Sequence, residues 1–197
     1  GYSDMAIGIA LILGYRFKDN FMAPFKAQNP SDFWRRWHIS LSTWLRDYVY
    51  IPLGGNRRGA SRTYLNNFLT MLIGGLWHGA SWMYVIWGAY HGLLLAVHKA
   101  LKPYWRLPDQ LKGRPEIRLA NMAVTFMLIV AGFVFFRASS LETVGTIATQ
   151  IFTDFHIDVA PQFVEGYMMI VAVMLLGLTM HLLPRSWSIG ASAAYVA

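Results

Sequence analysis

The sequence predicts an all-α, polytopic transmembrane helical bundle. Two observations lead to this prediction: the amino-acid composition and the presence of long apolar segments. Hydrophobic residues make up 55% of the 197 residues and charged residues only 14%, whereas soluble domains carry about 45–50% apolar and about 25% charged residues. This composition excludes a disordered chain, a coiled coil and an ordinary cytosolic enzyme. In a chain this apolar, the net charge of +7 indicates basic cytoplasmic loops. We therefore expect the chain to contact membrane lipid and not to bind nucleic acid.

Four apolar segments predict the membrane helices. Crossing about 30 Å of hydrocarbon takes about 20 apolar residues, and two segments reach that length while two are shorter. They are residues 65–76, 81–97, 117–136 and 166–183. The first two are expected to form a helical hairpin that folds back near Trp77, His78 and Gly79.

Charges between the apolar segments predict which side of the membrane each loop faces. Residues 99–118 contain six basic residues, whereas residues 139–165 contain four acidic residues and no Lys or Arg. The six are Lys99, Lys102, Arg106, Lys112, Arg114 and Arg118. By the positive-inside rule the first loop is cytoplasmic and the second faces the outer side. The arginines before residue 65 also place the start of the hairpin inside, so we expect His78 deep in the membrane or near its outer surface.

The first residues carry a further expectation. Residues 7–13 are an apolar run without the basic segment that opens a signal peptide. We expect this run to be the end of a membrane helix. Residues 1–197 would then be the C-terminal part of one membrane domain, with the N-terminal half outside this sequence.

Residues 29–50 differ from the apolar segments. Asn29 is suited to cap a helix, Pro30 to its first position and Asp32 to its first turn, where the helix dipole favours negative charge. Apolar residues then recur at spacings of three and four. They are Phe33, Trp37, Leu41, Trp44 and Tyr48. The pattern predicts one amphipathic helix around residues 30–50 that lies at the membrane interface or re-enters a cavity.

His78 is the strongest candidate for chemistry. It lies between glycines, which allow close approach of a backbone or a substrate chain, and an ionisable residue within a membrane segment is a functional hypothesis. Burial disfavours the imidazolium form, so the ring would be neutral and able to accept a proton. The alternative is a structural histidine that donates a hydrogen bond to a carbonyl.

Other histidines and arginines have weaker cases. His38 lies at the edge of the aromatic stripe and could face lipid headgroups. His91 could hydrogen-bond a neighbouring helix. Arg35 and Arg36 could meet an anionic ligand such as a nucleotide-bearing thioester, but membrane topology and anionic lipid headgroups explain such arginines more readily than a specific site does.

Several kinds of site are not indicated. The chain has no cysteine, which excludes disulfides and thiolate metal ligands. The histidines show no metal-binding spacing, so we expect no metal and no bound cofactor. A phosphate-binding GxxxxGK[ST] loop and a GxSxG serine motif are both absent from the sequence.

Two dense motifs carry a resemblance to a known family. They are NPSDFWRRWHISLSTWLRDYVYIPLGGNR at residues 29–57 and GLWHGASW at residues 75–82, the latter followed by WGAYHG at residues 87–92. A weaker pattern, FVFFRA, follows at residues 133–138. The chain resembles the membrane-bound O-acyltransferases over roughly residues 14–138. It is most similar to their bacterial alginate O-acetyltransferase branch.

The resemblance implies a fold, a reaction and partners. It implies a many-helix membrane body with a tunnel, in which His78 is the catalytic histidine and His38 the second active-site position. The reaction would move an acyl group, acetyl in this branch, from a thioester such as acetyl-CoA to hydroxyls of an extracytoplasmic polysaccharide such as alginate. It would take place in the bacterial inner membrane with a periplasmic partner protein. Substrate-binding candidates within the motifs are Trp34, Arg35, Arg36, Trp37, Asp47, Trp77, Trp82 and His91.

A second function class remains open at this point. In a non-catalytic transporter or channel subunit, the same histidines would line a proton or solute path. Acylated product distinguishes the two classes, because a transporter gives flux without it.

Overall fold

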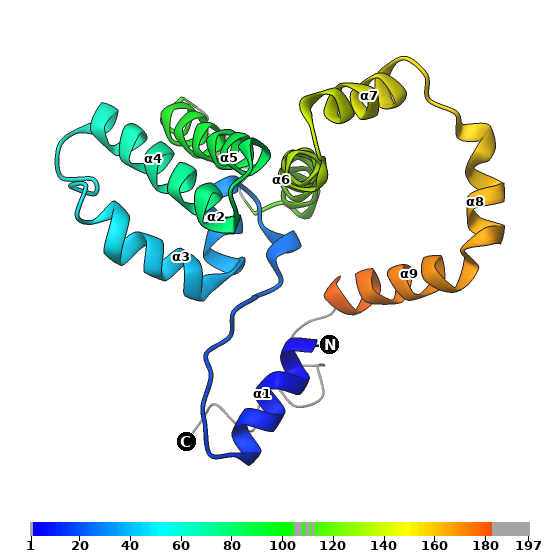
Figure 1. Ribbon diagram of the computed structural model, residues 1–197, viewed down its shortest axis with the longest axis horizontal. Coiled ribbons are helices and arrows are strands. Elements are labelled where there is room, and N and C mark those ends of the chain that lie inside the picture. Colours follow the sequence, from blue (N-terminus) through cyan, green and yellow to red (C-terminus); the bar gives the residue numbers. More distant parts are fainter. Residues whose placement is uncertain (1, 105–107, 109–110, 112, 183–197) are drawn as a thin grey trace. The chain divides into compact units, whose positions relative to one another are not determined.

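The computed structural model describes residues 2–104, 108, 111 and 113–182, and these form helices and loops without a strand (Figure 1). Arg106, Lys112 and Leu183, which belong to the predicted loop and span, lie outside the described residues. The chain divides into two units, residues 1–140 and 141–197. Unit 1 contains α1 (Tyr2–Ile12), η1 (Pro24–Lys26), α2 (Pro30–Arg36), α3 (Ile39–Leu45), the π-helical turn η2 (Arg46–Tyr50), α4 (Ala60–His78), α5 (Trp82–Leu101) and α6 (Pro115–Arg137).

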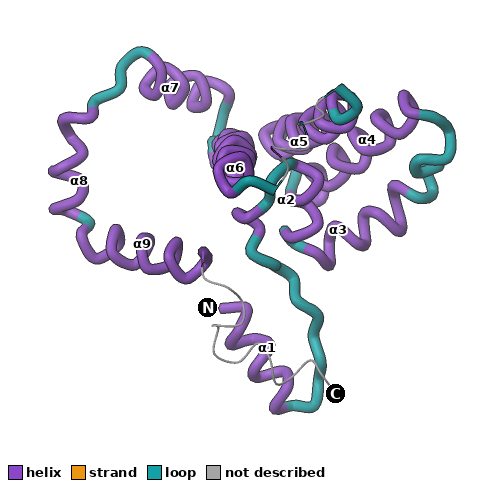
Figure 2. Tube along the Cα trace, turned by 180° about the vertical axis from the view of Figure 1, so that it is seen from behind, coloured by secondary structure: helices purple, strands orange, loops and turns teal. Residues whose placement is uncertain are grey.

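The predicted hairpin is confirmed by α4 and α5, which lie side by side in both views (Figures 1 and 2). Glycines set their close approach. A Cβ atom at Gly88 would lie 2.5 Å from the carbonyl oxygen of Met71, and one at Gly92 would lie 2.9 Å from Cα of Phe68. A Cβ at Gly75 would overlap the Tyr84 carbonyl oxygen. The two backbones therefore touch along a row of small residues, a common way for apolar helices to associate.

Helix α6 packs against α5 in the same manner. A Cβ at Gly132 would lie 2.6 Å from Nε2 of His91, and the Tyr90 hydroxyl donates to the carbonyl oxygen of Leu128 at 2.8 Å. Helix α6 covers the predicted span 117–136. Within the described part of the chain, it is the single helix that alone is long and apolar enough to cross a membrane.

The predicted single helix around residues 30–50 is wrong in one respect. Asn29 does cap α2, its side chain accepting from the Asp32 N–H at 2.8 Å. The helix stops at Arg36, however, and a new one begins at Ile39 because His38 has left-handed backbone angles, φ 46° and ψ 55°. Helix α3 then continues into η2.

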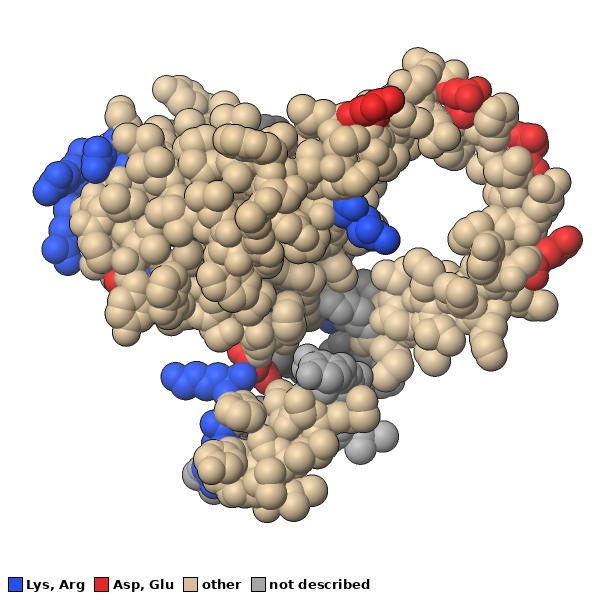
Figure 3. Space-filling model, viewed as in Figure 1, with Lys and Arg blue, Asp and Glu red and all other residues tan. Residues whose placement is uncertain are grey.

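The aromatic residues of α2 form the core of unit 1. Phe33 is buried against Ala27 and against Ile129 of α6, and Trp37 stacks on Phe33 with ring centroids 5.5 Å apart. Phe25, Trp34 and Phe133 complete this cluster. Of the stripe expected to face a membrane interface, Phe33 is buried and Trp37 and Leu41 are half-buried, whereas Trp44 and Tyr48 are exposed. Basic side chains gather instead over the turn between η2 and α4 (blue, left of Figure 3).

Unit 2 contains α7 (Leu141–Phe152), η4 (Ile157–Val159), α8 (Ala160–Gly166) and α9 (Met168–Leu182). The predicted continuous span 166–183 is wrong at its start, because Tyr167 leaves the helical conformation with φ −125° and ψ 27°. Residues Ile157–Gly166 and Met168–Met180 reach the length of a span only as a pair bent by 96°. The acidic residues of this unit lie along α7, α8 and the loop between them (red in Figure 3).

Candidate functional site

His78 is the last residue of α4, and the local sequence explains why the helix ends there. Gly79 takes φ 153°, which a residue with a side chain rarely adopts. Ser81 then opens α5, its side-chain oxygen accepting from the Met83 N–H at 3.2 Å. The imidazole is therefore presented at a helix terminus, at the turn of the hairpin.

Four aromatic rings surround His78, and they come from α4, α5 and α6. The centroid distances are 5.1 Å to Trp77, 6.1 Å to Tyr84, 5.1 Å to Trp87 and 5.0 Å to Phe136. The Trp87 and Phe136 rings stand perpendicular to the imidazole, at 90° and 89°. The ring is half-buried, so this aromatic cage holds it in one orientation while leaving it reachable. A fixed, accessible imidazole can take and return a proton.

His38 lies near the cage although it is 40 positions from His78 in the sequence. Its ring is 6.2 Å from the Trp77 indole and 6.0 Å from Phe21, and Trp77 also contacts His78. The Nδ1 atom of His38 is buried and has no hydrogen-bond partner among the described residues. The two histidines named by the motifs thus flank one indole.

His91 lies on the other side of Trp87, in a group of three packed rings. Its centroid is 4.9 Å from Trp87 and 5.3 Å from Trp34, and its side chain is almost fully buried. Neither ring nitrogen finds a hydrogen-bond partner in the part of the chain that is described. The contact of His91 with α6 is therefore packing at Gly132, and the hydrogen bond to a neighbouring helix that the sequence suggested is not observed.

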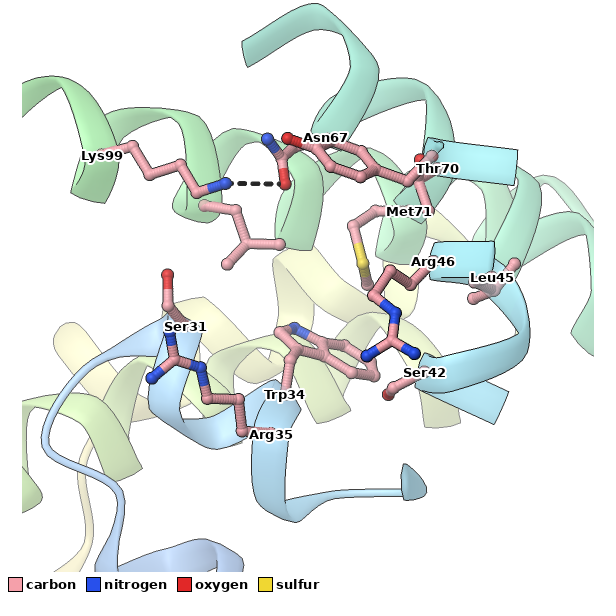
Figure 4. Close-up of a pocket in the computed structure, with 12 residues that line it drawn as sticks. Ser31, Trp34, Arg35, Ser42, Leu45, Arg46, Asn67, Thr70, Met71 and Lys99 are labelled. Carbon is pink, nitrogen blue, oxygen red and sulfur yellow. Dashed lines mark hydrogen bonds between the residues drawn. The ribbon is translucent and has the colours of Figure 1, made fainter. Parts of the chain in front are cut away.

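A cavity of about 280 Å³ opens beside this group, and Figure 4 shows its walls. Trp34 lines it, and three basic side chains reach it from three elements: Arg35 from α2, Arg46 from η2 and Lys99 from α5. Lys99 donates to Oδ1 of Asn67 at 3.0 Å. Polar groups on the remaining wall come from Ser31, Ser42 and Thr70. Arg35 and Lys99 bring positive charge to this partly polar cavity, whereas the charge of Arg46 is offset by its ion pair with Asp47. A net positive charge of this kind attracts an anionic group.

Three other candidates have partners of their own or are exposed. Arg36 pairs with Asp32 at 2.9 Å. Asp47 pairs with Arg46 at 2.7 Å, and the hydrogen bond from that guanidinium lowers the pKa of Asp47. Trp82, at the start of α5, is 80% exposed. Among the residues that are described, no group of three or more His, Cys, Asp or Glu could hold a metal ion.

Comparison with known proteins decides the family. The sequence model of the membrane-bound O-acyltransferase family, MBOAT, matches residues 1–141. The chain belongs to this family. Both sequence motifs, both histidines and the cavity lie inside the matched region of this MBOAT chain.

Curated relatives of this MBOAT chain are named for three different polymers: alginate, peptidoglycan and teichoic acid. It is 52% identical over 157 residues to the probable alginate O-acetylase AlgI of Pseudomonas syringae pv. tomato, covering 78% of this chain and 28% of that protein. It is 46% identical over 148 residues to the peptidoglycan O-acetyltransferase of Helicobacter pylori, covering 73% and 26%. It is 32% identical over 145 residues to the teichoic acid D-alanyltransferase of Bacillus subtilis, covering 69% and 36%. The chain thus spans under two-fifths of the length of these relatives.

Sequence reasoning missed several residues of the candidate site. Lys99 and Asn67 line the cavity, and Tyr84 and Phe136 complete the cage around His78. Tyr84 and Phe136 lie inside apolar segments, where an aromatic residue carries no signal beyond packing. Lys99 was read as loop charge, and its distance of 32 positions from Asn67 gave no reason to pair them.

Proposed function

We propose that the full-length protein is an O-acetyltransferase of the bacterial inner membrane. It moves an acetyl group from a thioester donor to hydroxyls of an extracytoplasmic polysaccharide such as alginate. The observation that carries this proposal is His78, held at a helix terminus in an aromatic cage with His38 nearby, in a chain of the MBOAT family. The names of relatives that O-acetylate alginate or peptidoglycan support the acceptor class.

The reaction assigns a task to each histidine. Neutral His78 takes the proton of the accepting hydroxyl as its oxygen attacks the thioester carbonyl. The carbon–sulfur bond then breaks, and the thiolate leaves with the proton that His78 returns. Proton transfer of this kind contributes typically about 10²–10⁴-fold to a rate. His38, across Trp77 from His78, orients the carbonyl or the acceptor.

The donor enters through the cavity lined by Arg35, Arg46 and Lys99. Acetyl-CoA and other phosphate-bearing thioesters carry the negative charge that these cations attract. The forked guanidinium of arginine fits a phosphate better than a point charge does. Trp34 lines the cavity and also contacts the ring group that leads through Trp87 to His78.

The acceptor side follows from the loop charges. A cytoplasmic donor and an outer acceptor have to meet at a residue buried between them, and the hairpin turn that begins at His78 suits this position. A periplasmic acyltransferase partner would carry the acetyl group onward to the polymer, its serine serving as the hydroxyl that His78 deprotonates.

Transfer of labelled acetyl groups in membranes that contain the full-length protein tests the proposal. We compare wild type with His78→Ala and with the control His156→Ala, whose exposed imidazole lies between Asp154 and Asp158 in unit 2. We expect His78→Ala to lose transfer and His156→Ala to keep it. Near-wild-type acetylation by a folded His78→Ala variant contradicts the role of His78, and solute flux without any acetylated product supports a transporter instead.

A further inference from the structure

The backbone of His38 is unusual, and something must hold it. Left-handed angles are uncommon outside glycine, although histidine is among the residues that adopt them more often. Such a conformation persists only where its surroundings determine it. The apolar spacing of residues 33–48 fits one uninterrupted helix, so the local sequence itself favours the alternative in which His38 is helical.

Asn20, from the loop before η1, makes the contacts that oppose this alternative. Its backbone oxygen accepts from the Ile39 N–H at 2.9 Å, and its side-chain Oδ1 accepts from the Ser40 N–H at 2.9 Å and from the Ser40 hydroxyl at 3.0 Å. These N–H groups open α3. The side chain of His38, at the capping position, makes no such bond. Asn20 therefore supplies the cap of α3 from a distant segment.

The same segment also closes the other side of the break. The Met22 N–H donates to the carbonyl oxygen of Arg36 at 2.8 Å, in the last turn of α2. The Phe21 ring between them lies 5.0 Å from Trp37 and 6.0 Å from His38. Residues 20–22 thus bind both helix ends that flank His38.

We propose that Asn20 is a positioning residue that sets His38 beside Trp77 and, through Trp77, beside His78. The inference rests on the proposed function, in which His38 orients a reacting group. With Oδ1 in place, the backbone stays left-handed at His38 and the imidazole faces Trp77. Without it, the Ser40 N–H loses its acceptor, while the Ile39 N–H keeps the backbone oxygen of Asn20. Continuing α2 into α3 satisfies the Ser40 N–H through the carbonyl oxygen of Arg36, and this rotation carries the imidazole away from Trp77.

The test measures acetyl transfer by the full-length protein in membranes, with Asn20→Leu and Asn20→Asp. Asn20→Leu has a similar size but no side-chain acceptor, whereas Asn20→Asp keeps an oxygen at the position of Oδ1. We expect kcat to fall about 10- to 100-fold for Asn20→Leu, as expected for a misplaced reacting group, with KM for the donor within about twofold. Asn20→Asp should keep kcat near the wild-type value. A side chain that only fills space at this position would not distinguish Asp from Leu in this way.

Three further variants make the result decisive. Ser40→Ala removes the hydroxyl bond to Oδ1 but keeps the backbone N–H, and we expect it to match wild type. If Asn20→Leu does not accumulate in membranes, Asn20→Gln displaces the acceptor by one methylene and should show the same fall in kcat. His78→Ala separates the two proposals: activity in this variant overturns the proposed function. An inactive His78→Ala together with wild-type kcat in Asn20→Leu, or with no rescue by Asn20→Asp, overturns the role of Asn20 alone.

Discussion

A methyl group at the crossing of α4 and α5 should separate the two helices and displace His78. In Gly88→Ala the new Cβ would lie 2.5 Å from the carbonyl oxygen of Met71 and 3.1 Å from Cα of Leu72. Favourable contacts between such atoms lie near 3.5 Å, so the helices must move apart by roughly 1 Å. Both atoms belong to the backbone of α4 and cannot rotate away as a side chain could.

The cost of this substitution follows from that overlap. Overpacking in a filled core costs about 1–3 kcal/mol, and the rigid neighbours place Gly88→Ala at the upper end. Alanine returns about 0.5–1 kcal/mol through its better helix propensity, which leaves a net loss of about 2 kcal/mol in the free energy of unfolding. His78 lies two turns beyond Met71 on α4, so we also expect acetyl transfer to fall by about 10- to 100-fold.

Thermal unfolding of the detergent-solubilised full-length protein checks this prediction, together with acetyl transfer in membranes. Gly145→Ala in α7 is the matched control, because Gly145 is also helical and a Cβ there meets nothing within 4 Å. We expect the control to unfold at the same temperature as wild type or slightly higher. Equal unfolding temperatures and equal activities for the two variants would refute the close approach at Gly88.

Three further predictions concern single contacts. Asn66→Leu removes the buried hydrogen bond that Nδ2 donates to the Gly55 carbonyl oxygen at 2.8 Å, and should lower the free energy of unfolding by about 1–3 kcal/mol. An unchanged unfolding temperature would contradict a stabilising role of this hydrogen bond. Tyr90→Phe removes the hydrogen bond from the hydroxyl to the Leu128 carbonyl oxygen and should lower the free energy of unfolding by about 0.5–1.5 kcal/mol without changing activity. A loss of activity at unchanged stability would contradict this purely structural role. Lys99→Met should raise KM for the thioester donor about tenfold or more, with little change in kcat, because a charged contact of this kind is made equally in the ground state and the transition state. An unchanged KM in initial-rate measurements would show that Lys99 does not contact the donor.

The sequence predicted the elements whose signals are local. The apolar length of α6, the cap at Asn29 and the turn at His78 depend on residues that are neighbours in the chain. The motifs also named the two histidines that the structure brings to one indole. The first three features could be read from spacing and residue type alone, whereas the pairing of His38 with His78 came from the resemblance to the family.

Other features depend on contacts between distant segments and could not be predicted. The spacing of Phe33, Trp37 and Leu41 is helical, yet the helix breaks at His38, where Asn20 caps the new helix from another segment. The cavity requires Arg35 and Lys99 to meet across two helices, and no periodicity records that. The bend at Tyr167 lies within residues 166–183, which contain no Asp, Glu, Lys or Arg to mark it.

The rate of acetyl transfer by the His78→Gln variant of the full-length protein, at equal amounts in membranes, tests the central claim most directly. Glutamine keeps a polar side chain in the aromatic cage but cannot accept a proton near neutrality. We expect kcat to fall by about 10²-fold or more, with KM for the donor nearly unchanged. A kcat within about twofold of wild type would contradict proton transfer by His78 and the mechanism built on it.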